Sequence, residues 1–262
     1  MLVHDRLGAG PPLVLIHGIG ARRGAWDPVV QQLGTARETF AVDTPGFGDS
    51  PPLAANGGAL TIDSYVDAFE QFFADAGLDR PHVAGNSMGG GIALELARRG
   101  AVASATALSP IGFWNRLESS YSRASLLLTH FLAVRAGGLL KRGVGSAVGR
   151  QLLLGQMYGQ PAKVDAAAAR LDVEKLAGAP GFEATLPALG AYQFAHGEQL
   201  DGIPVTIGWG TRDRLLVSPS QPRRAQALLP HARHVPLPRC GHLPMADDPR
   251  AVADLLLVAS GG

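Results

Sequence analysis

The residues best suited to chemistry in this sequence lie in Gly85-Asn86-Ser87-Met88-Gly89. This Gly-x-Ser-x-Gly pattern follows a short apolar segment and precedes a helical one, a context typical of a sharp strand-to-helix turn that presents one serine. Side chains in place of Gly85 and Gly89 would collide with the neighbouring helix and strand. We therefore expect Ser87 to hold strained backbone angles, with its hydroxyl at the positive end of the following helix. The alternative is a glycine-rich turn with an incidental serine.

A serine hydroxyl needs a base, and usually an acid that orients the base, before it attacks at neutral pH. Among the eight histidines, His242 is the best candidate because it follows a predicted strand. Ligands of open α/β sheets bind beyond the carboxyl ends of the strands. Asp213 also follows a predicted strand and is the candidate acid, whereas Asp247 and Asp248 are expected to start the last helix. The sequence therefore predicts a triad of Ser87, His242 and Asp213.

An attacked carbonyl develops negative charge on its oxygen, which two preorganised backbone N–H groups should face. Met88 directly follows the serine and would supply one of them. Ile19 would supply the other from His17-Gly18-Ile19-Gly20, a turn that follows an apolar segment. We expect His17 to hold this turn by hydrogen bonds rather than to act as a base.

The elements that must position these groups alternate along the chain. Strands are predicted at 13–16, 40–42, 82–84, 102–108, 205–207 and 233–237, and helices at 26–33, 92–99, 225–229 and 251–258. A further helix should be capped by Thr61 and end at Gly77. A short strand over residues 2–7 is expected to form a hairpin with 13–16. The alternation predicts an α/β fold with a mostly parallel, doubly wound sheet.

The alternation stops between about residues 111 and 200. Leucine-rich segments separated by glycines predict several consecutive helices there, the glycines being Gly137, Gly138, Gly143 and Gly155. An alanine-rich helix is predicted at 166–176. We interpret residues 111–200 as a helical cap, or lid, inserted into a core made of 1–110 and 201–262. A separate helical domain is the alternative.

Composition narrows the class of protein. Of the 262 residues, 46% are hydrophobic and 17% charged, enough to bury a large core. A net charge of +1 gives no electrostatic sign of nucleic-acid binding. The single Cys240 excludes an intrachain disulfide and a thiolate zinc cluster, and no apolar run approaches the ~20 residues that span a bilayer. We expect a cytoplasmic protein that acts on a small molecule, with no sequence signal for its oligomeric state.

Five segments of the chain resemble, in order, the motifs of the α/β-hydrolase superfamily. They are His17-Gly18-Ile19-Gly20, residues 43–50, residues 85–90, Gly210-Thr211-Arg212-Asp213 and Gly241-His242. The order of serine, acid and histidine is also the order of this superfamily. The resemblance implies the α/β-hydrolase fold with a helical cap, and a serine hydrolase without cofactor or metal. The amino end is short for this family, so the first of its usual eight strands is expected to be missing.

The resemblance favours hydrolysis of a carboxylic ester or lactone of a small, largely apolar substrate through an acyl-enzyme. Haloalkane dehalogenases and epoxide hydrolases of this superfamily use aspartate where Ser87 stands. We expect Trp114, where the cap leaves the sheet, and Leu243 to line the substrate pocket.

Two other functions stay open. Residues 85–90 also resemble the elbow of C–C bond hydrolases that act on aromatic meta-cleavage products. Those enzymes tend to carry a tryptophan directly after the histidine, where Leu243 stands here, and they use a cap arginine. The candidates for that arginine are Arg116, Arg123, Arg135 and Arg142. A non-catalytic binder of a small ligand on the same fold is the second alternative.

For four further side chains we expect simpler roles. Cys240 should pack as a small buried thiol, and Asp43 should be structural. Arg22 and Arg23 could meet a substrate carboxylate, although a solvated loop is the simpler expectation.

Overall fold

The computed structural model describes residues 1–53, 59–200 and 202–261. Within them seven strands form one sheet with the order β1-β3-β2-β4-β5-β6-β7. The strands are β1 (His4–Gly8), β2 (Pro12–Ile16), β3 (Glu38–Val42), β4 (His82–Asn86), β5 (Ser104–Leu108), β6 (Val205–Gly210) and β7 (Arg233–Leu237). All neighbouring pairs are parallel except β1 and β3. The fold is the predicted α/β-hydrolase fold with a mostly parallel sheet.

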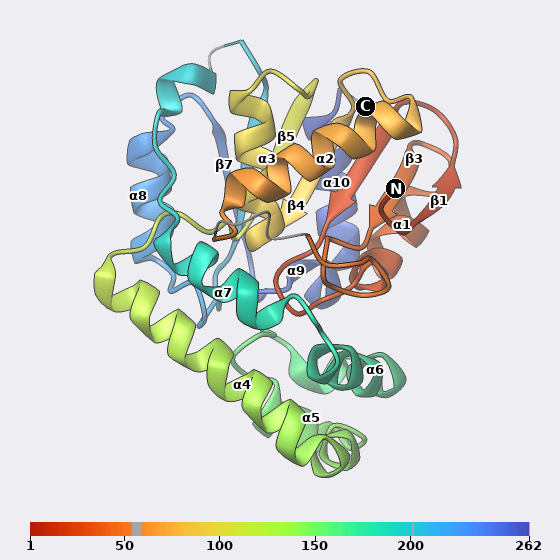
Figure 1. Cartoon of the computed structure of the whole chain (residues 1–262), viewed down its shortest axis with the longest axis vertical. Coiled ribbons are helices and arrows are strands. Elements are labelled where there is room, and N and C mark those ends of the chain that lie inside the picture. The colour runs from red at the N-terminus through yellow and green to blue at the C-terminus, as the bar shows by residue number, and fades with distance from the viewer. Residues whose placement is uncertain (54–58, 201, 262) are drawn as a thin grey trace.

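Helices cover both faces of the sheet, with α2 and α3 in front and α10 behind in Figure 1. The helices of the sheet region are α1 (Asp27–Leu33), α2 (Ile62–Ala76), α3 (Met88–Arg98), α8 (Ser220–Leu228), α9 (Pro244–Asp247) and α10 (Pro249–Ala259). Between β5 and β6 lie α4 (Arg116–Gly143), α5 (Ala147–Leu153), α6 (Ala166–Ala177) and α7 (Phe182–Ala191). Short 3-10 segments occur at Arg23–Trp26, Pro161–Lys163 and Gly197–Leu200.

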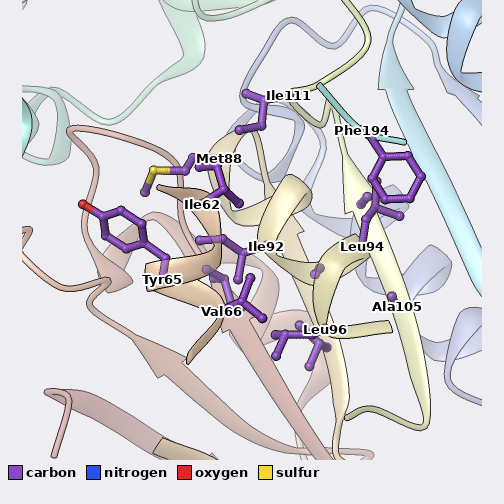
Figure 2. Packing of buried hydrophobic residues seen from close by; sticks show 14 of the residues in the cluster. Ile62, Tyr65, Val66, Met88, Ile92, Leu94, Leu96, Ala105, Ile111 and Phe194 are labelled. Atoms are coloured by element: carbon purple, nitrogen blue, oxygen red, sulfur yellow. The ribbon is translucent and has the colours of Figure 1, made fainter. Parts of the chain in front are cut away.

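Strand β2 is apolar without interruption from Leu13 to Ile16 because both of its faces are buried. Successive side chains of a strand point to opposite faces of the sheet. Val14 and Ile16 pack into the core shared with α2 and α3, whereas Leu13 and Leu15 pack into the core shared with α1 and α10. In the first core, Ile62 and Val66 of α2 lie beside Met88 and Ile92 of α3, as Figure 2 shows. Burial on both faces therefore requires apolar residues at every position.

Helix α2 begins and ends as its sequence predicts. The Thr61 side chain accepts a hydrogen bond from the Ser64 N–H, and the Ser64 hydroxyl accepts one from the Thr61 N–H. This reciprocal pair satisfies two N–H groups that have no partner inside the helix. Gly77 ends the helix in the left-handed conformation, with φ of 68°.

The predicted hairpin between the first two strands is wrong. β1 pairs with β3 instead, with His4 opposite Val42 and Gly8 opposite Glu38. Both edges of β2 are already occupied by the parallel strands β3 and β4. The open edge of β3 is therefore the place where β1 can complete its backbone hydrogen bonds.

The segment between β5 and β6 is helical, as predicted, but its helices differ in extent. Gly137 and Gly138 directly follow a kink at Ala136, where φ of −127° and ψ of 22° leave the helical conformation and two helical stretches of α4 meet, as the glycines predicted. α7, which holds Pro187 inside the helix, was not predicted as a separate helix. Figure 1 shows α4, α5 and α6 projecting away from the sheet.

No helix formed by the described residues has both the length and the apolar character that crossing a membrane requires.

We predict that Thr61→Ala lowers the free energy of unfolding by about 1 kcal/mol, because it removes the cap acceptor and leaves a helical N–H without a partner. Denaturant unfolding followed by circular dichroism measures the change. Thr129→Ala, the same substitution inside exposed α4, is the matched control and should leave stability equal or slightly higher. Equal losses in both variants would contradict the capping interpretation.

Candidate active site

Ser87 sits in the turn between β4 and α3, with φ of 57° and ψ of −115°. A residue other than glycine rarely has a positive φ, so the surrounding packing must hold Ser87 in this conformation. The two glycines of the motif make the turn possible. A Cβ on Gly85 would lie 1.9 Å from the Gly89 carbonyl oxygen, and a Cβ on Gly89 would lie 2.3 Å from that of Ile16. The close backbone contacts that the sequence predicts at Gly85 and Gly89 are therefore present.

His242 and Asp213 meet beyond the ends of two neighbouring strands, β7 and β6. His242 Nδ1 lies 2.9 Å from Asp213 Oδ2, and both side chains are buried. The other carboxylate oxygen accepts the backbone N–H groups of Leu215 and Leu216, at 3.0 and 2.9 Å. Because an ionised carboxylate only accepts hydrogen bonds, Nδ1 carries the proton and Nε2 is left as a free acceptor.

Ser87 and His242 line one cavity of about 380 Å³. Among the described residues, no hydrogen bond joins the Ser87 hydroxyl to the imidazole. Hydrogen bonds of ligand-free active sites are often long and tighten when a substrate binds. Ser87 and His242 of the predicted triad thus line one cavity, and Asp213 lies behind His242, joined to it by a hydrogen bond.

The His17-Gly18-Ile19-Gly20 turn abuts the serine. A Cβ on Gly18 would lie 3.0 Å from the Ser87 Cβ. His17 Nδ1–H donates to the Gly18 carbonyl at 2.7 Å, while Nε2 accepts the Thr44 N–H at 2.9 Å. In a trans peptide the N–H points opposite to the carbonyl. His17 therefore turns the Gly18 carbonyl toward itself and directs the Ile19 N–H away.

The two candidate oxyanion donors are both free of protein acceptors within the described part of the chain. Met88 is the first residue of α3, so its N–H has no partner inside the helix. Ile19 lines the cavity beside Ser87. Unpaired N–H groups next to a serine hydroxyl are the donors that a developing oxyanion requires.

His17 acts as a neutral, structural group. Burial lowers its pKa, against the opposing effects of the Gly18 carbonyl and Asp43. Asp43 is itself buried and accepts the backbone N–H groups of Arg23 and Asp49. The structural roles expected for both side chains are present.

Two positioning residues escaped the sequence analysis. The Asn86 amide donates to the carbonyl of His242 at 2.9 Å and to that of Leu108 at 3.1 Å. Asn86, which directly precedes Ser87, thus binds the backbone of His242, the candidate base. Its place inside the Gly-x-Ser-x-Gly motif was the only signal in the sequence.

Asp247 is the second of these residues, and its predicted place at the start of the last helix is wrong. It ends α9, and its carboxylate accepts the N–H groups of Gly241, Gly159 and Gln160 at 2.7 to 2.8 Å. The loop before His242 is thereby fastened to the inserted segment. Asp248 caps α10 through the Ala251 N–H, as expected.

The cavity lies between the sheet and the inserted helices, and most of its wall is apolar. Its larger apolar residues from the inserted segment include Leu126, Leu154, Met157, Val173, Leu176 and Phe182. Leu243 lines the cavity as expected, but Trp114 does not. The Trp114 indole instead donates to the Tyr192 carbonyl at 3.1 Å, within the packed core. The sequence placed Trp114 near the junction correctly but could not tell which way its ring points.

None of the four arginines considered for a C–C hydrolase lines this cavity, the four being Arg116, Arg123, Arg135 and Arg142.

The expectation of a solvated loop at Arg22 and Arg23 is wrong. Arg22 lines the cavity, and its Nε lies 3.3 Å from the carboxylate of Asp172 on α6. Burial raises the pKa of Asp172, although Arg22 opposes this shift. Arg23 bridges Asp5, Asp43 and Asp49. Both guanidinium groups therefore join segments that lie far apart in the sequence.

Cys240 is buried and contacts the apolar core around α10, as expected. Burial raises the pKa of its thiol to about 12, so the group stays protonated and unreactive.

A known protein family also matches the chain. The model of the alpha/beta hydrolase family matches residues 13–255. The chain belongs to this family.

Individual relatives agree with the assignment. An uncharacterized protein of Mycobacterium tuberculosis is 26% identical over 265 residues, which cover 95% of this chain and 75% of that protein. The crystal structure of an esterase from Rhodococcus sp. ECU1013 has a TM-score of 0.77 at 23% identity, covering 100% of this chain and 94% of the other. That of a bacterial membrane phospholipase A has a TM-score of 0.73 at 25% identity, covering 100% and 86%. Hydrolases of this fold are thus similar along the whole chain.

We predict that His17 makes stability depend on pH. Burial holds its pKa below the ordinary 6.5, so below pH 6.5 the unfolded chain binds a proton that the folded protein excludes. The stability gained by keeping His17 neutral is therefore fully present above pH 6.5 and is lost as the pH falls below it. In His17→Gln the free energy of unfolding should therefore decline less steeply below pH 6.5 than in the wild type.

Urea unfolding at a series of pH values measures this slope. His231→Gln, at an exposed histidine, is the control and should keep the wild-type slope. A slope unchanged in His17→Gln would show that another group causes the acid sensitivity.

Proposed function

We propose that the protein is a serine hydrolase that cleaves a carboxylic ester or lactone of a small, largely apolar substrate through an acyl-enzyme. The observation that carries this proposal is the position and hydrogen bonding of the His242 imidazole. Asp213 binds its Nδ1, and His242 lines the same cavity as Ser87. A base with a fixed tautomer beside a serine at a positive-φ turn is the arrangement that nucleophilic catalysis needs.

In the first half of the reaction, the Ser87 oxygen attacks the carbonyl carbon while His242 Nε2 takes its proton. Negative charge on the carbonyl oxygen is stabilised by the N–H groups of Ile19 and Met88. Asp213 stabilises the imidazolium that forms, since its second oxygen stays bound to two backbone N–H groups. The C–O bond then breaks, and the leaving alkoxide takes the proton from His242.

In the second half, His242 removes a proton from a water molecule that attacks the acyl-enzyme. The same two N–H groups stabilise the second oxyanion, and its collapse releases the carboxylic acid and returns the proton to Ser87. Each half begins and ends with neutral His242, so no proton is gained or lost by the protein. With a lactone, the alcohol and the acid leave as one molecule.

The wall of the cavity supports the substrate class. Its apolar side chains favour an apolar acyl or alcohol group. The charged residues of the mostly apolar wall are Arg22, Lys163, Asp165 and Asp172. We also propose that residues 111–200 act as a cap over a core of 1–110 and 201–262, because both parts contribute side chains to this cavity.

The C–C hydrolase alternative has less support. The tryptophan that it would place after the histidine is replaced by Leu243, and no arginine of the inserted segment reaches the cavity wall.

We predict that a fluorophosphonate probe adds once to the wild-type protein, at Ser87, and not at all to Ser87→Ala. Hydrolysis of p-nitrophenyl esters should fall by at least about 10³-fold in the variant, because the nucleophile is gone. Intact-protein mass spectrometry and steady-state kinetics measure these effects. Ser125→Ala, which changes another serine of the same cavity wall, is the matched control and should keep labelling and activity.

Absence of any adduct on the folded wild type would favour a non-catalytic binder. Turnover of a ring-fission dienone with p-nitrophenyl esters left untouched would favour the C–C hydrolase.

We predict that Asp213→Asn lowers kcat by about 10³- to 10⁴-fold with a small change in KM. The amide oxygen can still accept the N–H groups of Leu215 and Leu216, which turns the NH₂ group toward His242. An NH₂ donor would force the proton onto Nε2, where the serine needs an acceptor. Asp75→Asn on the surface of α2 is the control. A kcat close to the wild-type value would exclude Asp213 as the orienting acid.

A further inference from the structure

Helix α4 exposes a long apolar stripe that the proposed reaction does not explain. Its members are Leu117, Tyr121, Leu128, Phe131, Leu132 and Leu139, which we call the α4 outer face. Each is at least 39% exposed, and Leu117 reaches 83%. Adjoining α5 exposes Val148 and Leu152 as well. Elsewhere in the described chain, exposed large apolar side chains are few and scattered. A contiguous patch of this kind marks a surface that contacts something.

Most of the stripe lies on the side of α4 that faces away from the protein, whereas the Tyr121 hydroxyl donates to the Arg214 carbonyl at 3.0 Å and accepts from the Gln156 amide at 2.9 Å. Residues spaced by three, four and seven positions share one face of a helix. The buried residues Ser119, Ser122, Leu126 and Ala133 form one such set, and α4 packs through it against α6 and α7. The outer face forms a second set at the same spacing, half a turn away. α4 therefore has a covered side of small and apolar residues and an apolar side that is largely uncovered.

Positive charge accompanies this face. Residues 116–153 contain six Lys and Arg side chains and one acid, Glu118, although the whole chain carries only +1. Glu118 is paired with Arg224, and Lys141 is paired with Glu174. Arg150 is buried and donates to backbone carbonyls, which leaves four arginines. Arg116, Arg123, Arg135 and Arg142 are exposed, and Arg135 lies over the Phe131 ring at 5.9 Å. The excess of positive charge is thus concentrated on the helices that carry the apolar stripe.

We propose that the α4 outer face docks on an anionic lipid surface. Apolar and aromatic side chains of such a helix enter the boundary between headgroups and acyl chains. The flanking arginines bind lipid phosphates, for which the planar guanidinium is well suited. A second copy of this chain fits the face poorly, because it would bring two clusters of like charge together.

Docking would also place the cavity near the lipid. Ser125, Leu126 and Thr129 line the cavity from the same helix that carries the outer face. The inference rests on exposure and charge alone, so it does not depend on the catalytic proposal.

Flotation of the full chain with vesicles tests the proposal. The protein should float with vesicles of equal parts phosphatidylcholine and phosphatidylglycerol, and not with phosphatidylcholine alone. Added salt should weaken binding. Leu128→Glu/Phe131→Glu should reduce binding at least about tenfold by removing apolar insertion, and Arg135→Glu/Arg142→Glu should do so by reversing two charges.

Val258→Glu and Arg250→Glu, at exposed positions of α10, are the matched controls and should bind as the wild type does. Circular dichroism and p-nitrophenyl ester hydrolysis verify that each variant is folded. Failure of the wild type to float, or equal binding by the outer-face variants, would overturn the proposal. So would a dimer, detected by light scattering, that Leu128→Glu/Phe131→Glu dissociates while vesicles are not bound, because a second copy would then cover the face.

Discussion

The backbone turn at Ser87 is the constraint on which the rest of the site depends. A residue with a side chain holds φ of 57° there only because the chain enters from β4 and leaves into α3 with almost no space between them. The absence of a side chain at Gly85 lets the first turn of α3 lie against β4, and its absence at Gly89 lets α3 lie against β2. The strain is balanced by burial on all sides, since β4 is central in the sheet and α3 is almost wholly buried.

Hydrogen bonds to backbone groups connect this turn to the other parts of the site. Asn86 binds the carbonyl of His242 across the sheet, and Asp247 binds the N–H of Gly241 from the far side of the same loop. Asp213 is fixed by two N–H groups of its own loop before it reaches the imidazole. His242 is therefore oriented through its main chain as well as its ring. Such preorganisation lowers the reorganisation that a reaction would otherwise require.

The sequence predicted the parts of this arrangement that follow from local rules. Continuous apolar runs identified the buried strands, and the Thr61 cap and Gly77 gave the ends of α2. Ser87, Asp213 and His242 could be chosen because each follows a strand, and the ends of parallel strands gather at one edge of the sheet. The contacts of Asn86 and Asp247 could not be predicted in this way, because they join residues as much as 156 positions apart in the chain.

Helix α4 shows a different reason why a pattern can mislead. A helix with one buried side has a single apolar stripe, and its period is then easy to read. α4 packs one side toward the cavity and leaves a second apolar side exposed, so its leucines occur at almost every spacing. Gly137 and Gly138 suggested a break, and they directly follow the kink at Ala136 where two helical stretches of α4 meet. When a helix has apolar residues on two faces, their spacing in the sequence no longer follows one helical period, so neither face can be recognised from it.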